Sequence, residues 1–206
     1  MGTLDEFDTF WRRIKAQGTS APVFDLLKSH YSEKHRAYHN LKHISDCLAE
    51  FNSIRRRCEN ADAVEFALWF HDVIYDPKAK DNEEQSATLA KRVCADVKLP
   101  AHFGMCVETL ILATKHAAEP IGNDTQIIVD VDLSILGQSE VAFDKYERNI
   151  RAEYTWVPER QFRSGRAAIL KNFLARERIF STEHFHLKYE AAARANLARS
   201  LQKLTA

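Results

Sequence analysis

The chain has 206 residues, of which 45% are hydrophobic, and this is enough for one good-sized core, most simply in a single domain spanning residues 1–206. Its 29 basic and 29 acidic residues cancel, so it lacks the positive field that drives non-specific binding of large nucleic acids. No apolar run approaches the length of a membrane span, and the N-terminal segment has no signal-peptide core. We therefore expect a soluble, cytoplasmic protein with neither large nucleic acid nor membrane as a partner.

The first part of the chain predicts helix after helix. Apolar residues recur at helical spacing over residues 7–14, and Pro22 opens a second helix. A third helix is expected from about Asn40 to Arg56. The next, over residues 63–76, has the sequence AVEFALWFHDVIYD and should end at Pro77. Its apolar sides indicate a central, buried position.

The remaining chain is also predicted to be helical. One helix, capped by Asp81 or Asn82, should end before Pro100. The apolar run Ile127–Leu136 has the β-branched content of a buried strand, but we expect a helix because no second strand is available to pair with it. Further helices are expected at about 102–117, 139–154, 158–177 and 183–203. The predicted fold class is all-α, a bundle of about eight to ten helices.

The four cysteines do not form a CxxC pair. They are Cys47, Cys58, Cys94 and Cys106, and all fall within helical patterns. We therefore expect buried thiols in a reducing compartment, and neither disulfides nor zinc ligands.

A set of histidines and aspartates stands out at spacings that suit one metal ion. The string YHNLKHISD places His39 and His43 four residues apart, on one face if the helix begins early enough. His71 and Asp72 follow 28 residues after His43, and the acidic run at 130–132 lies 58 to 60 residues beyond Asp72. Each part alone is common, but side chains from three helices can converge on one ion inside a bundle. Imidazole and carboxylate donors suit Mn, Fe, Co, Ni, Zn or Mg.

This combination resembles the HD superfamily of metal-dependent phosphohydrolases over residues 38–137. The opening YHNxxH and the closing DLS are similar to the matching motifs of cyclic-nucleotide phosphodiesterases. A fuller pattern resembles a bacterial group of small HD-domain proteins along nearly the whole chain. It consists of YHNLKHI, FALWFHDVIYD, NEEQSA, ATKH, DVDLSILG and ARANL. The resemblance implies a metal-site core over 38–137, with the helices of 138–206 packing on it.

The resemblance also implies a ligand set for the first metal. It consists of His43, His71, Asp72 and Asp132, and Asp72 is counted with the catalytic residues as well. Asp132 is preferred to Asp130 because it directly precedes the Leu-Ser of the DLS motif, which leaves Asp130 as a helix cap or a partner of a ligand. Four protein ligands leave room for water and substrate only on a five- or six-coordinate ion. Mn, Fe, Co, Ni or Mg is therefore favoured over tetrahedral Zn.

Other residues are candidates for catalysis and substrate binding. His39 is placed like the phosphodiesterase general acid, and the alternative is a histidine at a helix start that only bonds a carboxylate. Glu83 is a candidate base or partner of a ligating histidine, and the alternative is an exposed glutamate favoured by the helix dipole. Lys115, His116 and Arg166 are candidates for binding a substrate phosphate, and His116 also for a second metal. A solvated surface position is the alternative for Lys115 and Arg166.

These patterns favour a metal-dependent phosphohydrolase that cleaves a phosphoester or phosphoanhydride bond of a small molecule, most simply a nucleotide, with water activated by the metal. Three alternatives stay open at this point. They are a non-catalytic nucleotide-binding sensor, a di-iron oxygenase, and a protein with a purely structural metal. A homodimer is compatible with the sequence.

Overall fold

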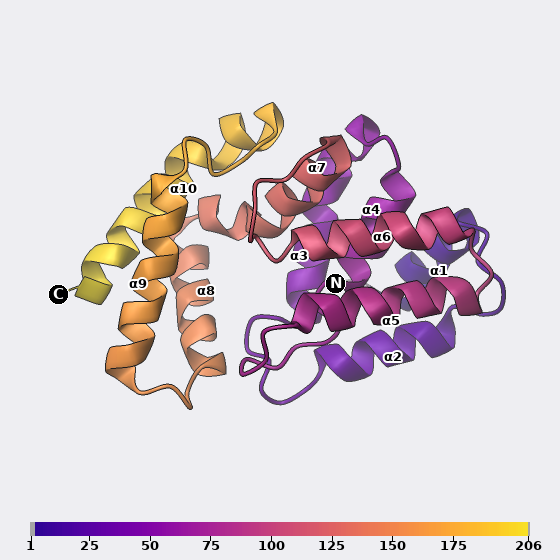
Figure 1. Ribbon diagram of the computed structural model, residues 1–206, viewed down its shortest axis with the longest axis horizontal. Coiled ribbons are helices and arrows are strands. Elements are labelled where there is room, and N and C mark those ends of the chain that lie inside the picture. The colour runs from indigo at the N-terminus through magenta and orange to yellow at the C-terminus, as the bar shows by residue number, and fades with distance from the viewer. Residues whose placement is uncertain (1–2, 206) are drawn as a thin grey trace. The chain divides into compact units, whose positions relative to one another are not determined.

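The computed structural model describes residues 3–205, and over this range the chain is helical, with ten α-helices, two short 3-10 segments and no strand (Figure 1). The predicted all-α class is confirmed. The chain divides into two compact units, one up to Val129 and one from Asp130 onward. This boundary lies within α7 (Asn123–Asp132). The expectation of one domain over residues 1–206 stays a prediction.

In the first unit, α4 is the central helix. Its elements before α7 are α1 (Leu4–Arg13), α2 (Ala21–Tyr31), α3 (Leu41–Ile54), η1 (Arg55–Arg57), α4 (Ala61–Phe70), α5 (Asn82–Asp96) and α6 (Ala101–Ala113). Helix α4 contacts α3, α5 and α6, and α5 and α6 lie side by side (Figure 1). Most residues of α4 are fully buried, as expected for a helix that is apolar on all sides. The central position predicted for this segment is confirmed.

Polar side chains define where α4 begins. The side chain of Asn60 caps the helix by accepting the N–H of Ala63 at 3.1 Å. The carboxylate of Asp124, in the first turn of α7, accepts the N–H groups of Glu59 and Asn60 at 2.8 and 2.7 Å. The start of α4 is therefore fixed by its own cap and by the start of α7.

Aromatic side chains join α1 and α2 to α4. The ring of Trp69 meets that of Phe7 edge to face, with centroids 5.0 Å apart, and that of Phe24 at 6.3 Å. The hydroxyl of Tyr31 donates to the backbone carbonyl of Trp69 at 3.0 Å. Edge-to-face pairs stabilise beyond the area that they bury. The end of α4 that precedes His71 is thus rigidly packed.

The predicted helix over residues 63–76 is wrong in its second half, because α4 ends at Phe70. Side chains from outside the helix bind the backbone groups that a longer helix would have paired. Arg36 binds the carbonyl oxygens of Asp72 and Val73, and the hydroxyl of Ser86 accepts the N–H of Ile74 at 3.0 Å. The metal-site sequence after Phe70 therefore forms a turn.

One further boundary differs from the prediction, and one predicted cap makes no capping hydrogen bond. The helix expected over 102–117 ends at Ala113, where the hydroxyl of Thr114 donates to the carbonyl of Ile111 at 2.7 Å. Asp81 is the N-cap residue of α5, but its side chain makes no capping hydrogen bond. The helix expected over 127–136 is confirmed by α7 and by η2 (Leu133–Gly137).

The second unit contains η2, α8 (Glu140–Glu153), α9 (Glu159–Ala175) and α10 (Glu183–Thr205). Helix α10 packs against α9 and η2. Gly137 lies so close to Tyr189 that any Cβ atom there would overlap the tyrosine side chain. Asn196 donates to the carbonyl oxygens of Leu136 and Gln138 at 3.0 and 2.9 Å. These contacts attach η2 to α10.

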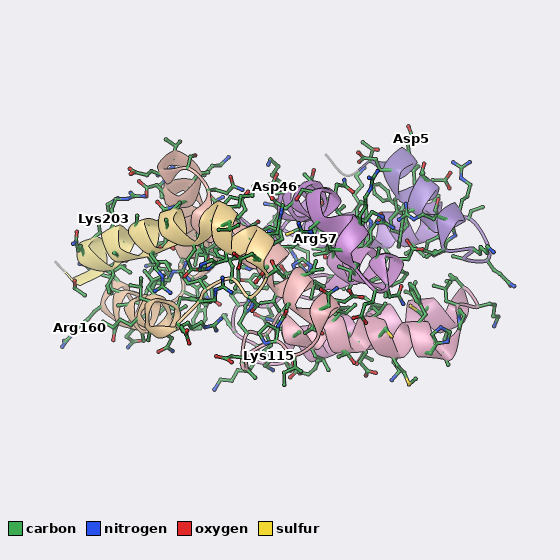
Figure 2. The ribbon with its side chains drawn as sticks, turned by 90° about the horizontal axis from the view of Figure 1, so that it is seen from above. Asp5, Asp46, Arg57, Lys115, Arg160 and Lys203 are labelled. Atoms are coloured by element: carbon green, nitrogen blue, oxygen red, sulfur yellow. The ribbon has the colours of Figure 1, made fainter. Side chains whose placement is uncertain are left out.

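The four cysteines differ in how far they are exposed to solvent, and exposed charged side chains lie on the surface. All four cysteines are free thiols; Cys47 and Cys94 are buried as predicted, and Cys58 is half-buried. Burial raises the pKa of the Cys94 thiol to about 12. The prediction is wrong for Cys106, which lies beside the exposed Met105 on the outer side of α6. Charged side chains extend outward in Figure 2, where exposed residues such as Asp46 are labelled.

Candidate metal centre

The first two candidate ligating side chains lie one turn apart on α3. Asn40 caps this helix by accepting the N–H of Lys42 at 2.9 Å, so the helix begins at Leu41. His43 and Cys47 then face the interior, with 4% and 2% of their surface exposed. Because residues four apart lie on one helix face, α3 presents both side chains to the same place.

His71 directly follows the last residue of α4 and is also buried. Its Nδ1 lies 3.0 Å from the carbonyl oxygen of Leu68. Because a carbonyl oxygen can only accept, Nδ1 donates a proton to it, and in the neutral imidazole Nε2 would present its lone pair. This backbone bond selects the tautomer and ring orientation that a metal ligand requires.

Three donor atoms meet at one point in the first unit. Nε2 of His43 lies 3.1 Å from Nε2 of His71, and Oδ2 of Asp72 lies 3.3 Å from the former and 3.2 Å from the latter. Atoms bound to one ion at about 2.1 Å are about 3.0 Å apart at octahedral angles and about 3.4 Å apart at tetrahedral angles. All three separations fall in this interval. The donors therefore fit one side of the coordination shell of a divalent ion.

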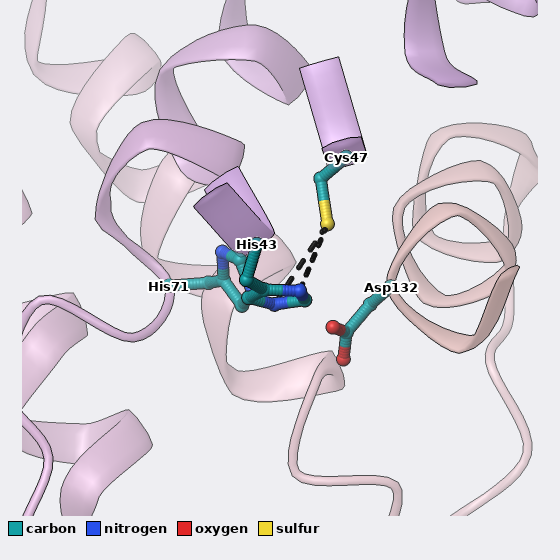
Figure 3. A group of neighbouring side chains, drawn as sticks. All are labelled: His43, Cys47, His71 and Asp132. Atoms are coloured by element: carbon teal, nitrogen blue, oxygen red, sulfur yellow. Dashed lines mark hydrogen bonds between the residues drawn. The ribbon is translucent and has the colours of Figure 1, made fainter. Parts of the chain in front are cut away.

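Cys47 adds a sulfur atom to this group. One candidate ligand atom from each of His43, Cys47 and His71 lies within 4.8 Å of the others, and Figure 3 draws these side chains together with Asp132. The sulfur is 3.6 Å from Nδ1 and 3.8 Å from Nε2 of His43, and these similar distances place it against the imidazole ring. The group is buried and could bind a metal ion.

The carboxylate of Asp72 is held in its anionic form. Burial raises its pKa, but the positive charges that His71 and His39 carry when protonated, and the hydrogen bonds that His43 and His71 then donate, outweigh this effect. The pKa of Asp72 is therefore well below its usual range. An ionised carboxylate is the form that binds cations.

The condition under which His39 and His43 would share one helix face is not met, because α3 begins two residues after His39. The His39 ring stacks on Tyr75, with centroids 4.2 Å apart and planes inclined by 29°, and meets Tyr38 edge to face at 5.0 Å. Its centroid is 6.0 Å from that of His43. His39 therefore lies beside the candidate ligands, placed there by Tyr75 and not by helix periodicity.

The two aspartates of the DVD motif lie in the second unit. Asp130 is fully buried, and its carboxylate accepts the N–H groups of Ser181 and Thr182 at 2.8 and 2.7 Å and the Thr182 hydroxyl at 2.7 Å. These residues immediately precede α10, so Asp130 fixes the segment that leads into that helix. Asp132 is the last residue of α7, and its role as a metal ligand stays a prediction.

The other predicted site residues lie on several elements. Glu83 is half-buried in the first turn of α5. The amine of Lys115 binds Glu84 and the carbonyl oxygen of Lys80, and His116 has a left-handed backbone with φ of 54°. Arg166, in the second unit, binds Glu147 and the hydroxyl of Tyr146. The substrate roles of Lys115, His116 and Arg166, and the role of Glu83 as a base, stay predictions.

Sequence reasoning missed three residues around the centre: Cys47, Tyr75 and Arg36. Cys47 follows His43 by four residues, so the spacing rule applied to His39 and His43 would have found it. Tyr75 acts by stacking on His39, and Arg36 by binding backbone carbonyl groups. Neither of these contacts leaves a pattern in the local sequence.

No helix in residues 3–205 has both the length and the apolar content needed to cross a membrane.

Comparison of the chain with protein-family models, with curated proteins and with solved structures gave no match. The function of the protein is therefore inferred from the side chains of the site itself.

Proposed function

We propose that this protein is a metal-dependent phosphohydrolase of the HD type, which cleaves a phosphoester or phosphoanhydride bond in a small molecule, most simply a nucleotide. The observation that carries the proposal is the triangle of His43 Nε2, His71 Nε2 and Asp72 Oδ2, with edges of 3.1 to 3.3 Å. In this proposal Asp132, from the DLS motif, is the fourth ligand. These residues follow one another along the chain in the order that the HD resemblance implies.

A divalent ion held by these side chains would polarise a phosphoryl oxygen and lower the pKa of a water molecule bound to it. The protein fixes the direction of the donor atoms through the backbone bond of His71, and Asp72 contributes a negative charge. Two imidazoles and two carboxylates leave coordination positions for water and substrate only on a five- or six-coordinate ion. The proposal therefore favours Mn, Fe, Co, Ni or Mg over Zn.

His39 is the proposed proton donor to the leaving oxygen. Its ring lies next to His43 without belonging to the triangle of ligands, and stacking on Tyr75 sets the plane of the ring. An imidazole can donate and accept protons near neutral pH. Its position beside His43 supports the proposal that His39 acts on a group bound at the metal.

Lys115 and Arg166 are the proposed contacts for the phosphate of the substrate, with His116 beside Lys115 in the chain. Each of the two cations already binds a carboxylate, Glu84 for Lys115 and Glu147 for Arg166. A substrate phosphate would have to share these cations with the carboxylates. Substitution of Lys115 should accordingly raise KM more than it lowers kcat.

The test is a hydrolysis screen of nucleoside mono-, di-, tri- and cyclic phosphates with Mn, Co, Ni and Mg added in turn. We expect metal-dependent release of phosphate or pyrophosphate that disappears in His71→Ala. His102→Ala is the matched control, because His102 is exposed on α6 and should leave the release unchanged. A protein that binds the metal through His71 but releases nothing from any of these compounds would contradict the proposal and favour a nucleotide sensor.

A further inference from the structure

One buried arginine connects the two segments of the first unit that hold the proposed catalytic groups. The Arg36 side chain is 0% exposed. Its Nη1 donates to the carbonyl oxygens of His39 at 3.1 Å and Asp72 at 2.6 Å, and its Nη2 donates to that of Val73 at 2.9 Å. A single nitrogen atom therefore bridges the backbone of the proposed proton donor and the backbone of a proposed ligand.

The guanidinium is itself held from several sides. Nε donates to the carboxylate of Glu33 at 2.9 Å, and the guanidinium carbon lies 5.3 and 5.5 Å from the ring centroids of Tyr31 and Tyr75. Tyr75 is also the ring on which His39 stacks. Arg36 thus contacts the backbone of His39 directly and supports its ring through a shared aromatic neighbour.

The chemistry of the guanidinium explains why an arginine suits this position. Its five N–H groups lie in one plane in fixed directions, so three carbonyl oxygens can be bound in only one relative arrangement. Two of these carbonyls belong to Asp72 and Val73, in the turn after α4, where no helix continues to bind them. A lysine keeps the charge but cannot reproduce the planar fork.

We infer that Arg36 is a positioning residue that fixes His39 relative to His71 and Asp72. Its hydrogen bonds to these segments go to the backbone carbonyl oxygens of His39, Asp72 and Val73, so it acts through the backbone of both segments. This role rests on the proposed function, because it presumes that the metal binds at the triangle and that His39 serves the bound substrate. The positioning role of Arg36 can be tested without observing hydrolysis.

The experiment compares wild type with Arg36→Ala and Arg36→Lys, and uses Co2+ as the probe. Affinity is measured by titration, and NMR follows the paramagnetic shift that bound Co2+ produces in the His39 ring signals. We expect both variants to bind Co2+ about 10- to 100-fold more weakly, and we expect the His39 shift to differ from wild type at saturating Co2+. Millimolar guanidinium should restore both quantities in Arg36→Ala, and methylammonium should not. Arg12→Ala is the control, because the Arg12 side chain is 73% exposed.

If Arg36→Ala does not fold, Arg36→Lys decides the matter through the His39 signal and the Co2+ affinity. If Arg36→Lys has the Co2+ affinity and the His39 shift of wild type, the inference is overturned. It is also overturned if Arg36→Ala folds but guanidinium restores neither its Co2+ affinity nor its His39 shift. A wild-type protein that binds Co2+ but hydrolyses no phosphate compound would overturn the hydrolase, while the positioning of His39 by Arg36 would still be read from the NMR shift. A wild-type protein that does not bind Co2+ would overturn both.

Discussion

Each unit of the molecule buries a polar cluster, and the charges of the two clusters are balanced in different ways. In the first unit, His43, His71 and Asp72 bring three donor atoms to one point. In the second unit, Arg166 binds the carboxylate of Glu147, which also accepts the hydroxyl of Ser200 at 2.8 Å. The second cluster contains its own cation, whereas the Asp72 carboxylate of the first lies between two imidazoles.

This difference indicates which cluster could bind a metal ion. A buried carboxylate paired with an arginine is satisfied within the chain, provided that both partners stay in place. A carboxylate that faces two imidazole nitrogens can be balanced by protons on those rings or by a cation from outside, and a divalent metal ion would bond all three atoms at once. We therefore expect the proposed metal at the first cluster, and we expect the pair in the second to stabilise the fold in addition to the substrate contact proposed for Arg166.

The largest effect is expected from breaking the pair in the second unit. Arg166→Met leaves the half-buried carboxylate of Glu147 without its cation, which should lower the free energy of unfolding by about 3 kcal/mol. Replacing both residues, as Arg166→Met with Glu147→Leu, should recover most of this loss. Urea denaturation of the metal-free protein measures both variants, and Co2+ affinity should stay unchanged. A single variant as stable as wild type would show that the pair is not a structural unit.

Removal of a proposed ligand should abolish the effect of metal on stability. Metal at about 100 times its dissociation constant stabilises the folded state by about 2.7 kcal/mol, so Co2+ or Mn2+ should raise the melting temperature of wild type. His71→Ala should lose this increase, and the exposed-site variant His102→Ala should keep it. Differential scanning calorimetry provides the comparison. Equal increases in His71→Ala and wild type would place the metal elsewhere.

The DVD motif offers a matched pair of substitutions. Asp130→Ala removes the acceptor for two N–H groups before α10 and should cost about 1–2 kcal/mol of stability, with Co2+ affinity unchanged. Asp132→Ala should instead weaken Co2+ binding about tenfold, equivalent to about 1.4 kcal/mol, without destabilising the metal-free protein. Unfolding and titration experiments on both variants show which of the two aspartates is the metal ligand. The reverse pattern would make Asp130 the ligand.

Glu190 in the second unit gives a pH test of a carboxylate that the chain itself satisfies. Burial raises its pKa, but the N–H groups of Ile179 and Phe180 and the charge of Arg194 together hold it below the ordinary value. Because the folded-state pKa is lowered, the stabilisation is present above the unfolded pKa of about 4.3 and disappears as pH falls through the folded pKa. Glu190→Gln should therefore cost about 1 kcal/mol at neutral pH and progressively less in acid. Urea denaturation of wild type and Glu190→Gln, from neutral pH to below the unfolded pKa of about 4.3, measures this cost. A cost that does not change with pH would contradict the prediction.

The smallest effect is expected at Cys47. Its sulfur lies against the ring of His43, so Cys47→Ser should leave Co2+ affinity within about threefold of wild type, and the Co2+ protein should lack an intense near-ultraviolet thiolate band. Absorption spectroscopy of both proteins checks this. A strong band that disappears in Cys47→Ser would make the sulfur a ligand and favour a softer metal such as Zn.

The helical fold could be predicted because its signals are local. Apolar spacing within α3, α4 and the segment 127–136 identified helices without knowledge of their neighbours. The turn after Phe70 could not be predicted, because it depends on Arg36 and Ser86, which lie 36 and 12 residues from the groups that they bind. Where distant side chains replace the helical hydrogen bonds, periodicity continues past the real end of the helix.

The candidate site could be predicted in part. His43, His71 and Asp72 were expected together from their residue types and order, and the structure brings them together. His39 was also expected beside them, but for the wrong reason, since Tyr75 and the preceding turn place it there. The supporting role of Arg36 depends on backbone carbonyl groups, which every residue carries and which leave no signal in the sequence.

The most direct test of the central claim is to measure the metal content of the wild-type protein and of His71→Ala by elemental mass spectrometry, after loading with Co2+ and removal of unbound ion. The His43, His71 and Asp72 triangle predicts about one tightly held ion per wild-type chain and close to none in the variant. Equal metal content in the two proteins, or none in wild type, would contradict the metal centre described here.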